Sequence, residues 1–261
     1  TRVFQLRLSE AHAATVSALA DRDLQAARRL QRQLPSAPAI LSIAELVRRV
    51  DLVIEAASLR MAGRVARVAL EAGRDVLIMS TGGLLAQPTR WARLAKRSGA
   101  QLLVPSGGLC GVDGLKAMAV GSIRRVRLTT RKPPPALAGA PYVQARRIRL
   151  AGLRHPLVLL EGSPTRMVRA FPQNANVAAT LALACAALSR SRRRIPMRVR
   201  LVADPTLRTN VHELEVEADC GRMSARMESR PSSRNPKTSE VAIRSAVATL
   251  HQYFAGTKIG T

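Results

Sequence analysis

Residues 51–83 have the sequence DLVIEAASLRMAGRVARVALEAGRDVLIMSTGG. The segments 51–57 and 75–81 are near-continuous apolar runs, which is the pattern of strands buried on both faces of a parallel sheet. Between them, apolar residues recur at helical spacing over 60–72, and Gly73 follows. We therefore expect a strand–helix–strand unit with parallel strands.

The same alternation continues on both sides of this unit. Before it lie an apolar run at 14–20 and helical patterns at 24–34 and 43–50, and after it lie a helical pattern at 88–97 and a strand pattern at 101–105. Small residues follow each strand, at the end where ligands bind in open α/β sheets. The first part of the chain therefore predicts a Rossmann-type domain.

The second half has a different pattern. Strands with period-two alternation are expected at 123–130, 157–160, 198–203, 211–218 and 223–227, and helices at 176–188 and 239–253. The predicted fold is α/β. It combines an N-terminally incomplete Rossmann-type parallel-sheet domain over 1–105, completed by a C-terminal helix within 229–261, with an α+β catalytic domain over 106–228 that has a mixed sheet.

The composition is strongly basic. Lys and Arg total 42 against 17 Asp and Glu, which gives a formal charge of +25. Such a balance is typical of nucleic-acid-binding proteins, but only 2% of the residues are aromatic, so few side chains are available to stack on bases. The densest basic run is 190–194, followed by Arg198 and Arg200. It is either a solvated loop or a patch for phosphate or another anionic partner.

Cysteine and histidine are sparse. Three cysteines are too few and too widely spaced for a disulfide framework or a Cys-rich zinc site, and the four histidines show no metal-binding spacing. We therefore expect no metal and a reduced, cytoplasmic setting. No apolar run reaches the roughly 18–20 residues of a membrane helix, so no membrane association is expected.

The glycine-rich turn that opens a dinucleotide-binding domain is absent from the sequence. Asp21 nevertheless follows an apolar strand, where the acidic residue that binds the ribose is found, about 20 positions after the glycines. Counting back places that turn at or just before Thr1. We expect strand one and its loop to be missing and residues 1–13 to be the remnant of the first helix. Alternatively, residues 3–8 form some other first element.

Several polar blocks in register along residues 14–250 resemble the L-aspartate dehydrogenase family. They are DLVIEAAS (51–58), STGGLLA (80–86), PSGGLCGVDGLKA (105–117), LTTRKPP (128–134), LLEGSPTRMVRAFPQNANVAATLALA (159–184), ADPTLRTNVHELEVEADCGRM (203–223) and NPKTS (235–239). The resemblance implies an enzyme that uses NAD or NADP to interconvert L-aspartate with iminoaspartate, or with oxaloacetate plus ammonia. It also implies a role in NAD biosynthesis. A homodimer is the expectation from the general prevalence of dimers.

The resemblance also assigns roles to individual residues. His212 matches the family's active-site histidine, and Gly108 and Asn176 match its cofactor contacts. Asp21 is the candidate for the ribose. Candidates for holding the dicarboxylate are three cations: Lys132, Arg131 and Lys237.

From the residues alone, each of these blocks also has a structural explanation. His212 is then a satisfied structural histidine on a strand, Asn176 a helix N-cap, and 237–239 a simple helix start. The sequence also departs from the family. Gly108 replaces the usual alanine, Cys110 replaces a small residue, and Arg208 and Thr209 are inverted.

Four further questions stay open. About six extra residues separate Asn176 from His212, and without a glycine turn the pyrophosphate lacks its main backbone donors. The alternative functions are a related two-domain dehydrogenase for another amino or hydroxy acid, and a non-catalytic, arginine-rich protein that binds polyanions. Asp21 favours NAD, whereas the neighbouring Arg22 favours the 2′-phosphate of NADP.

Overall fold

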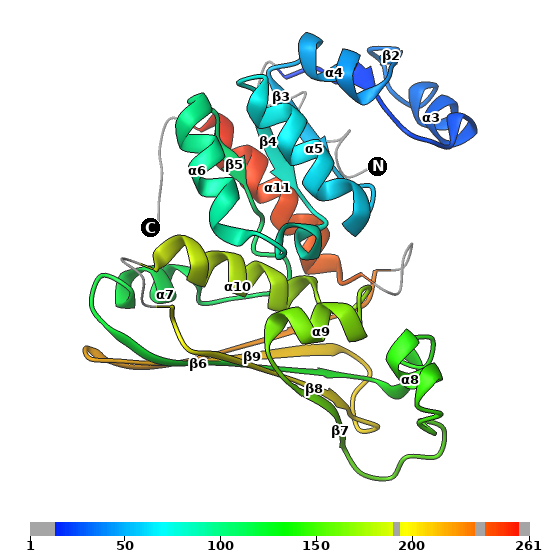
Figure 1. Cartoon of the computed structure of the whole chain (residues 1–261). Coiled ribbons are helices and arrows are strands. Elements are labelled where there is room, and N and C mark those ends of the chain that lie inside the picture. Colours follow the sequence, from blue (N-terminus) through cyan, green and yellow to red (C-terminus); the bar gives the residue numbers. More distant parts are fainter. Residues whose placement is uncertain (1–13, 190–193, 233–237, 256–261) are drawn as a thin grey trace. The chain divides into compact units, whose positions relative to one another are not determined.

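The computed structural model describes residues 14–189, 194–232 and 238–255 (Figure 1). The predicted helix remnant at 1–13, residues 190–193 of the basic run, and Lys237 lie outside these residues. Contacts divide the chain into two compact units. Of the described residues, the first unit contains 14–83, 90–105 and 247–255, and the second contains 84–89, 106–189, 194–232 and 238–246.

The first unit is built from parallel strands joined by helices, as expected for a Rossmann-type domain. β1 (Ala18–Leu19) pairs with β2 (Ala39–Ile40), and β3 (Leu52–Glu55), β4 (Asp75–Ile78) and β5 (Leu102–Leu103) form a second parallel sheet in that order. The helices are α3 (Leu24–Gln31), α4 (Ile43–Arg49), α5 (Leu59–Glu71) and α6 (Pro88–Ser98), with a short 3₁₀ turn at Thr81–Leu84. The sequence prediction missed β2, whereas the equally short β1 and β5 lie within the predicted segments 14–20 and 101–105.

Local signals in the sequence explain where these helices begin. The Asp23 carboxylate accepts hydrogen bonds from the amides of Gln25 and Ala26 and so caps α3. Ser42 and Glu45 form a reciprocal capping box at the start of α4. Gly83 packs so closely against the Leu59 carbonyl at the start of α5 that a side chain there has no room.

A buried carboxylate organises the carboxyl ends of β3 and β4. Glu55 is 2% exposed and accepts hydrogen bonds from the backbone amides of Ala57 (2.8 Å), Ser58 (3.1 Å) and Ser80 (3.0 Å). These amides belong to the two loops that follow the strands, so one side chain ties both loops to the sheet. Its two oxygens therefore satisfy three partly buried backbone donors.

The second unit contains a five-stranded mixed sheet, which confirms the predicted fold class. Its order is β10-β9-β6-β8-β7, with β6 and β8 parallel and every other pair antiparallel. The strands are β6 (Ile123–Lys132), β7 (Leu157–Gly162), β8 (Met197–Ala203), β9 (Asn210–Ala218) and β10 (Gly221–Ser229). The helices are α7 (Val112–Met118), α8 (Pro141–Ala145), α9 (Pro164–Ala170) and α10 (Asn176–Leu188), with a 3₁₀ turn at Pro134–Ala136.

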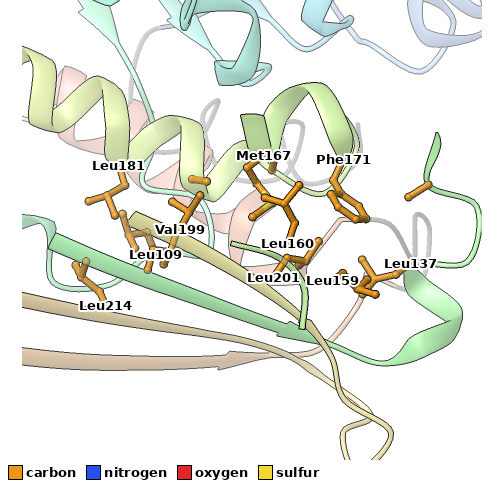
Figure 2. Close-up of a cluster of buried hydrophobic side chains, with 14 of the residues drawn as sticks. Leu109, Leu137, Leu159, Leu160, Met167, Phe171, Leu181, Val199, Leu201 and Leu214 are labelled. Atoms are coloured by element: carbon orange, nitrogen blue, oxygen red, sulfur yellow. The ribbon is translucent and has the colours of Figure 1, made fainter. Parts of the chain in front are cut away.

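One face of this sheet forms the hydrophobic core. The helices α7, α9 and α10 lie on this face (Figure 1), and Leu181 of α10 and Phe171 after α9 pack toward strand residues such as Leu214 and Leu201 (Figure 2). Successive strand residues point to opposite faces, so the apolar residues of β6, β8 and β9 alternate with polar ones.

The opposite face of the sheet carries rows of arginine and glutamate. Ion pairs cross from β6 to β9, as in Arg125–Glu217 (2.6 Å) and Arg127–Glu215 (3.7 Å), and from β8 to β7 in Arg200–Glu161 (2.8 Å). Much of the basic charge of these strands therefore faces carboxylates of the same sheet. Exposed pairs of this kind add little stability, typically 0–1 kcal/mol each.

The last helix runs from one unit into the other along the chain. α11 (Glu240–Phe254) begins in the second unit and ends in the first. In the first unit, the Tyr253 hydroxyl donates to the Asp75 carboxylate at 2.7 Å, and the other oxygen of Asp75 accepts from the amide of Gln101. Within the described residues, no helix is long and apolar enough to cross a bilayer.

We predict that Glu55→Ala lowers the free energy of unfolding by about 2–4 kcal/mol, because three partly buried amides lose the carboxylate that accepts from them. Urea unfolding followed by circular dichroism measures this change. Glu71→Ala is the control, since it removes an exposed carboxylate from the same unit and is expected to change stability by less than about 0.5 kcal/mol. Equal effects of the two substitutions would contradict the organising role of Glu55.

Candidate active site

His212 lies on β9 directly opposite Thr130 of β6. The imidazole is 5% exposed, and its Nδ1 atom is 3.0 Å from the Thr130 hydroxyl oxygen. A threonine hydroxyl can donate or accept, so it can hold either tautomer of the ring. The antiparallel register of β6 and β9 thus fixes one edge of the imidazole and leaves the Nε2 edge for another contact.

The alternation of β9 places His212 on the core face of the sheet. Its face-mates are Leu214 and Val216, whereas Glu213 and Glu215 point to the opposite face. His212 therefore lies on the same face of β9 as the apolar residues and not on the face of the glutamates.

Burial is the main influence on the protonation of His212. Together with the positive charge of Lys132, it lowers the pKa of His212 to about 3. The imidazole is consequently uncharged at neutral pH, and it is able to accept a proton.

Lys132 lies on the same face of β6 as Thr130, two residues further along the strand. The side chain is 6% exposed, and its ammonium donates to the amide oxygen of Asn174 at 3.1 Å. Burial lowers the pKa of Lys132 to about 8, so the group remains mostly charged at pH 7. Among the described residues, no carboxylate lies within 4 Å of this ammonium.

A glycine loop meets the free edge of the imidazole. A Cβ atom at Gly108 would lie 3.2 Å from Nε2 of His212 and 3.6 Å from the hydroxyl oxygen of Ser239. The loop is held in place because the amide of Gly107, with a φ of +65°, donates to the hydroxyl of Ser245 at 3.0 Å. Gly108 and Ser239 therefore border the space next to Nε2.

Arg131 is not brought together with His212. Its neighbour Lys132 occupies the core face, so Arg131 points to the opposite face, where it pairs with Glu213 at 3.1 Å and with Asp204 at 3.7 Å. Lys237 lies outside the described residues. Of the three candidate cations for the substrate, the described structure thus brings only Lys132 to His212.

Asn176 and Asp21 are both exposed. Asn176 is the first residue of α10, and Ala175 rather than Asn176 occupies the N-cap position. In the first unit, Asp21 follows β1, and one of its carboxylate oxygens accepts from the amide of Asp23 at 2.9 Å. Within the described chain, no cluster of three or more histidine, cysteine or acidic residues has a geometry suited to a metal ion.

Comparison with known families accounts for both units. Residues 113–253 match the family model described as aspartate dehydrogenase, C-terminal, which spans more than half of the chain. The chain belongs to the aspartate dehydrogenase family. Residues 2–105 match a second model, described as the NAD-binding domain of homoserine dehydrogenase.

Other members of the aspartate dehydrogenase family are similar over most of their length. L-aspartate dehydrogenase of Methanosarcina barkeri is 45% identical over 226 residues, covering 86% of this chain and 81% of the relative. L-aspartate dehydrogenase of Bradyrhizobium diazoefficiens is 35% identical over 254 residues, covering 97% of this chain and 88% of the relative.

Solved structures show the same fold. Aspartate dehydrogenase from Thermotoga maritima aligns with a TM-score of 0.70 and 21% identity, covering 95% of this chain and all of the other. A myo-inositol dehydrogenase from Lactobacillus casei aligns more loosely, with a TM-score of 0.55 and 12% identity over 97% of this chain and 81% of the other.

Two residues of this candidate site were not predicted from the sequence. Thr130 contacts His212, and Asn174 contacts Lys132, although both stood within blocks that the family resemblance had marked. For Thr130 a signal was present, because strand alternation places residue 130 on the same face as Lys132. For Asn174 no signal existed, since its position depends on how the loop before α10 folds.

We predict that the stability of this protein falls between pH 7 and pH 5 partly through His212. The unfolded chain binds a proton at this residue near its ordinary pKa of 6.5, whereas the folded chain does not until about pH 3. This stabilising contribution is therefore present above pH 6.5 and is lost as the pH falls toward 3.

Urea unfolding at pH 7 and pH 5 measures this effect. The difference in unfolding free energy between parent and His212→Gln should shrink by about 2 kcal/mol at the lower pH. His155→Gln, at an exposed position, is the control and should leave the pH dependence unchanged. A His212→Gln variant with the parent's pH dependence would show that the folded chain protonates His212 normally.

Proposed function

We propose that this chain catalyses the NAD(P)-dependent oxidation of L-aspartate to iminoaspartate, which is hydrolysed to oxaloacetate and ammonia. One observation carries the proposal: Lys132, a buried ammonium with no carboxylate partner among the described residues, lies beside a buried, uncharged histidine, His212. This pairing of an anion receptor with a proton acceptor is what the oxidation of an amino acid requires.

Lys132 receives a carboxylate of the substrate. A buried charge is costly unless it is paired, and Asn174 supplies only a neutral acceptor. A substrate carboxylate provides the missing negative charge and accepts from the remaining ammonium protons. Asn174 holds the ammonium in position for this contact.

His212 acts as the general base. In the tautomer that donates from Nδ1 to Thr130, the Nε2 atom has a free lone pair beside Gly108. It takes the proton of the substrate ammonium, so that the nitrogen can form the imine as the hydride leaves Cα. After the imidazolium has released this proton to solvent, the neutral ring takes a proton from the water that adds to the imine carbon. A bound dicarboxylate raises the proton affinity of His212, because it supplies negative charge next to it.

The residues present fit a nicotinamide dinucleotide. When bound, its nicotinamide ring accepts the hydride from Cα. The absence of a side chain at Gly108 lets the backbone lie against the Nε2 edge of His212, and Gly108 would contact the nicotinamide end of the cofactor. Asn176 offers an exposed amide for polar groups of the cofactor, and Asp21 offers a carboxylate oxygen after β1 for ribose hydroxyls.

The biological setting is a further part of this proposal. We place the enzyme in the cytoplasm, as a homodimer, upstream of NAD biosynthesis. All three cysteines, at positions 110, 185 and 220, are free thiols, which is compatible with a reducing compartment.

We predict that the full-length protein oxidises NADH or NADPH in the presence of oxaloacetate and ammonia, and that His212→Ala lowers kcat by about 100-fold or more. The coenzyme absorbance measures turnover, and parallel assays with other 2-oxo acids test the specificity. His251→Ala, on α11, is the matched control. Turnover that is independent of His212 would contradict its assigned role, and preference for a monocarboxylate would contradict the assigned substrate.

We predict that Lys132→Gln raises the KM for oxaloacetate at least about tenfold while the KM for the coenzyme changes less than about twofold. The reason is that a charge-assisted contact to a carboxylate is lost. Steady-state kinetics with either substrate varied separates the two constants. Lys96→Gln, at an exposed position on α6, controls for the loss of a positive charge. An unchanged KM for oxaloacetate would assign the carboxylate to another group.

A further inference from the structure

A cavity of about 380 Å³ lies in the second unit, beside α8 and α9. Three arginines line it: Arg146 at the end of α8, and Arg166 and Arg169 on α9. None of the three has a carboxylate partner among the described residues. The three side chains are exposed at one opening and have no counter-charge among the residues that the structure describes, so they are able to receive an anion.

The sequence around these three arginines also contains many more basic than acidic residues. Residues 133–203 contain twelve arginines and a single acid, Glu161. Glu161 is on β7 next to the cavity, but it points to the opposite face of the sheet and pairs with Arg200 at 2.8 Å. No other acid in this segment is available to neutralise the three arginines.

The rest of the cavity wall suits an organic group. Leu160, 4% exposed, and Ala170 contribute apolar surface, and Tyr142 contributes its ring. Arg146 stacks over that ring at 4.7 Å, and the Arg166 side chain lies over Gly162. These contacts hold two of the three guanidiniums at the cavity. Figure 2 shows Leu160 beside Met167 and Phe171 of the core, so the apolar wall is anchored to packed residues.

The cavity is separate from the space around His212. The strand register connects His212 to Thr130, Thr130 to Leu201, and Leu201 to Leu160 in one row across the sheet. Three strand spacings separate the ends of this row, which corresponds to about 14 Å. A substrate held by Lys132 therefore does not fill the cavity.

We propose that this cavity is a second ligand site, which binds the phosphate group of a small organic phosphate. A phosphate dianion has three peripheral oxygens, one for each guanidinium, whereas a carboxylate has two. The apolar wall then contacts the organic part of the ligand. The α9 helix that carries Arg166 and Arg169 leads directly into the loop of Asn174, the partner of Lys132.

Inorganic phosphate is the probe for this site. Its ³¹P resonance is recorded while the full-length protein is added, at constant ionic strength and with saturating NADH to fill the cofactor's own phosphate sites. We expect saturable line broadening. Arg166→Gln/Arg169→Gln should weaken the fitted affinity at least about tenfold. Arg149→Gln/Arg154→Gln removes the same charge from exposed positions of the same segment and should weaken it less than about twofold.

Three results would overturn the proposal: no saturable broadening, equal loss in both double variants, or displacement of phosphate by an equal concentration of acetate. Unfolding midpoints of the two double variants establish that both are folded. Because the readout is binding rather than turnover, the outcome is independent of whether the chain oxidises aspartate.

Discussion

The active centre depends on one buried positive charge. Lys132 is held in the interior by the β6 strand, and its partner in the described structure is a neutral amide, that of Asn174. The cost of this arrangement is offset only when an anion arrives. The same charge contributes to the low pKa of His212, so the unliganded site favours a neutral imidazole. In the proposed mechanism, the charge of Lys132 therefore links substrate binding to proton transfer.

The sequence predicted the fold well because its signals are local and repeated. The apolar runs around residues 51–57 and 75–81 became β3 and β4, and the period-two segments became the mixed sheet. The contents of the site were harder to predict. The sequence alone does not distinguish the neighbouring cations Arg131 and Lys132. In the structure, strand alternation places Lys132 on the face of His212 and Arg131 on the opposite face, where it forms ion pairs. Asn174 depends on tertiary folding of a loop, which no local pattern encodes.

The basic residues that give the net charge of +25 fall into physically different groups. On the outer face of the sheet, arginines such as Arg125 and Arg200 face glutamates of neighbouring strands. The glutamates largely neutralise those arginines, which argues against a continuous polyanion-binding surface on this face of the sheet. The arginines around α8 and α9, by contrast, form no ion pair within the described residues. The same holds for first-unit arginines such as Arg64 and Arg97, so the unpaired positive charge is distributed over both units.

The sheet also contains two register irregularities, between Ile123 and Arg125 in β6 and between Val158 and Leu160 in β7. The one in β6 lies at the end of the strand opposite to Thr130 and Lys132. An inserted or deleted residue near that end can be absorbed by the irregularity before it reverses the parity of the functional positions. A change in chain length near the start of β6 is therefore expected to leave Thr130 and Lys132 on the face of the sheet that carries His212.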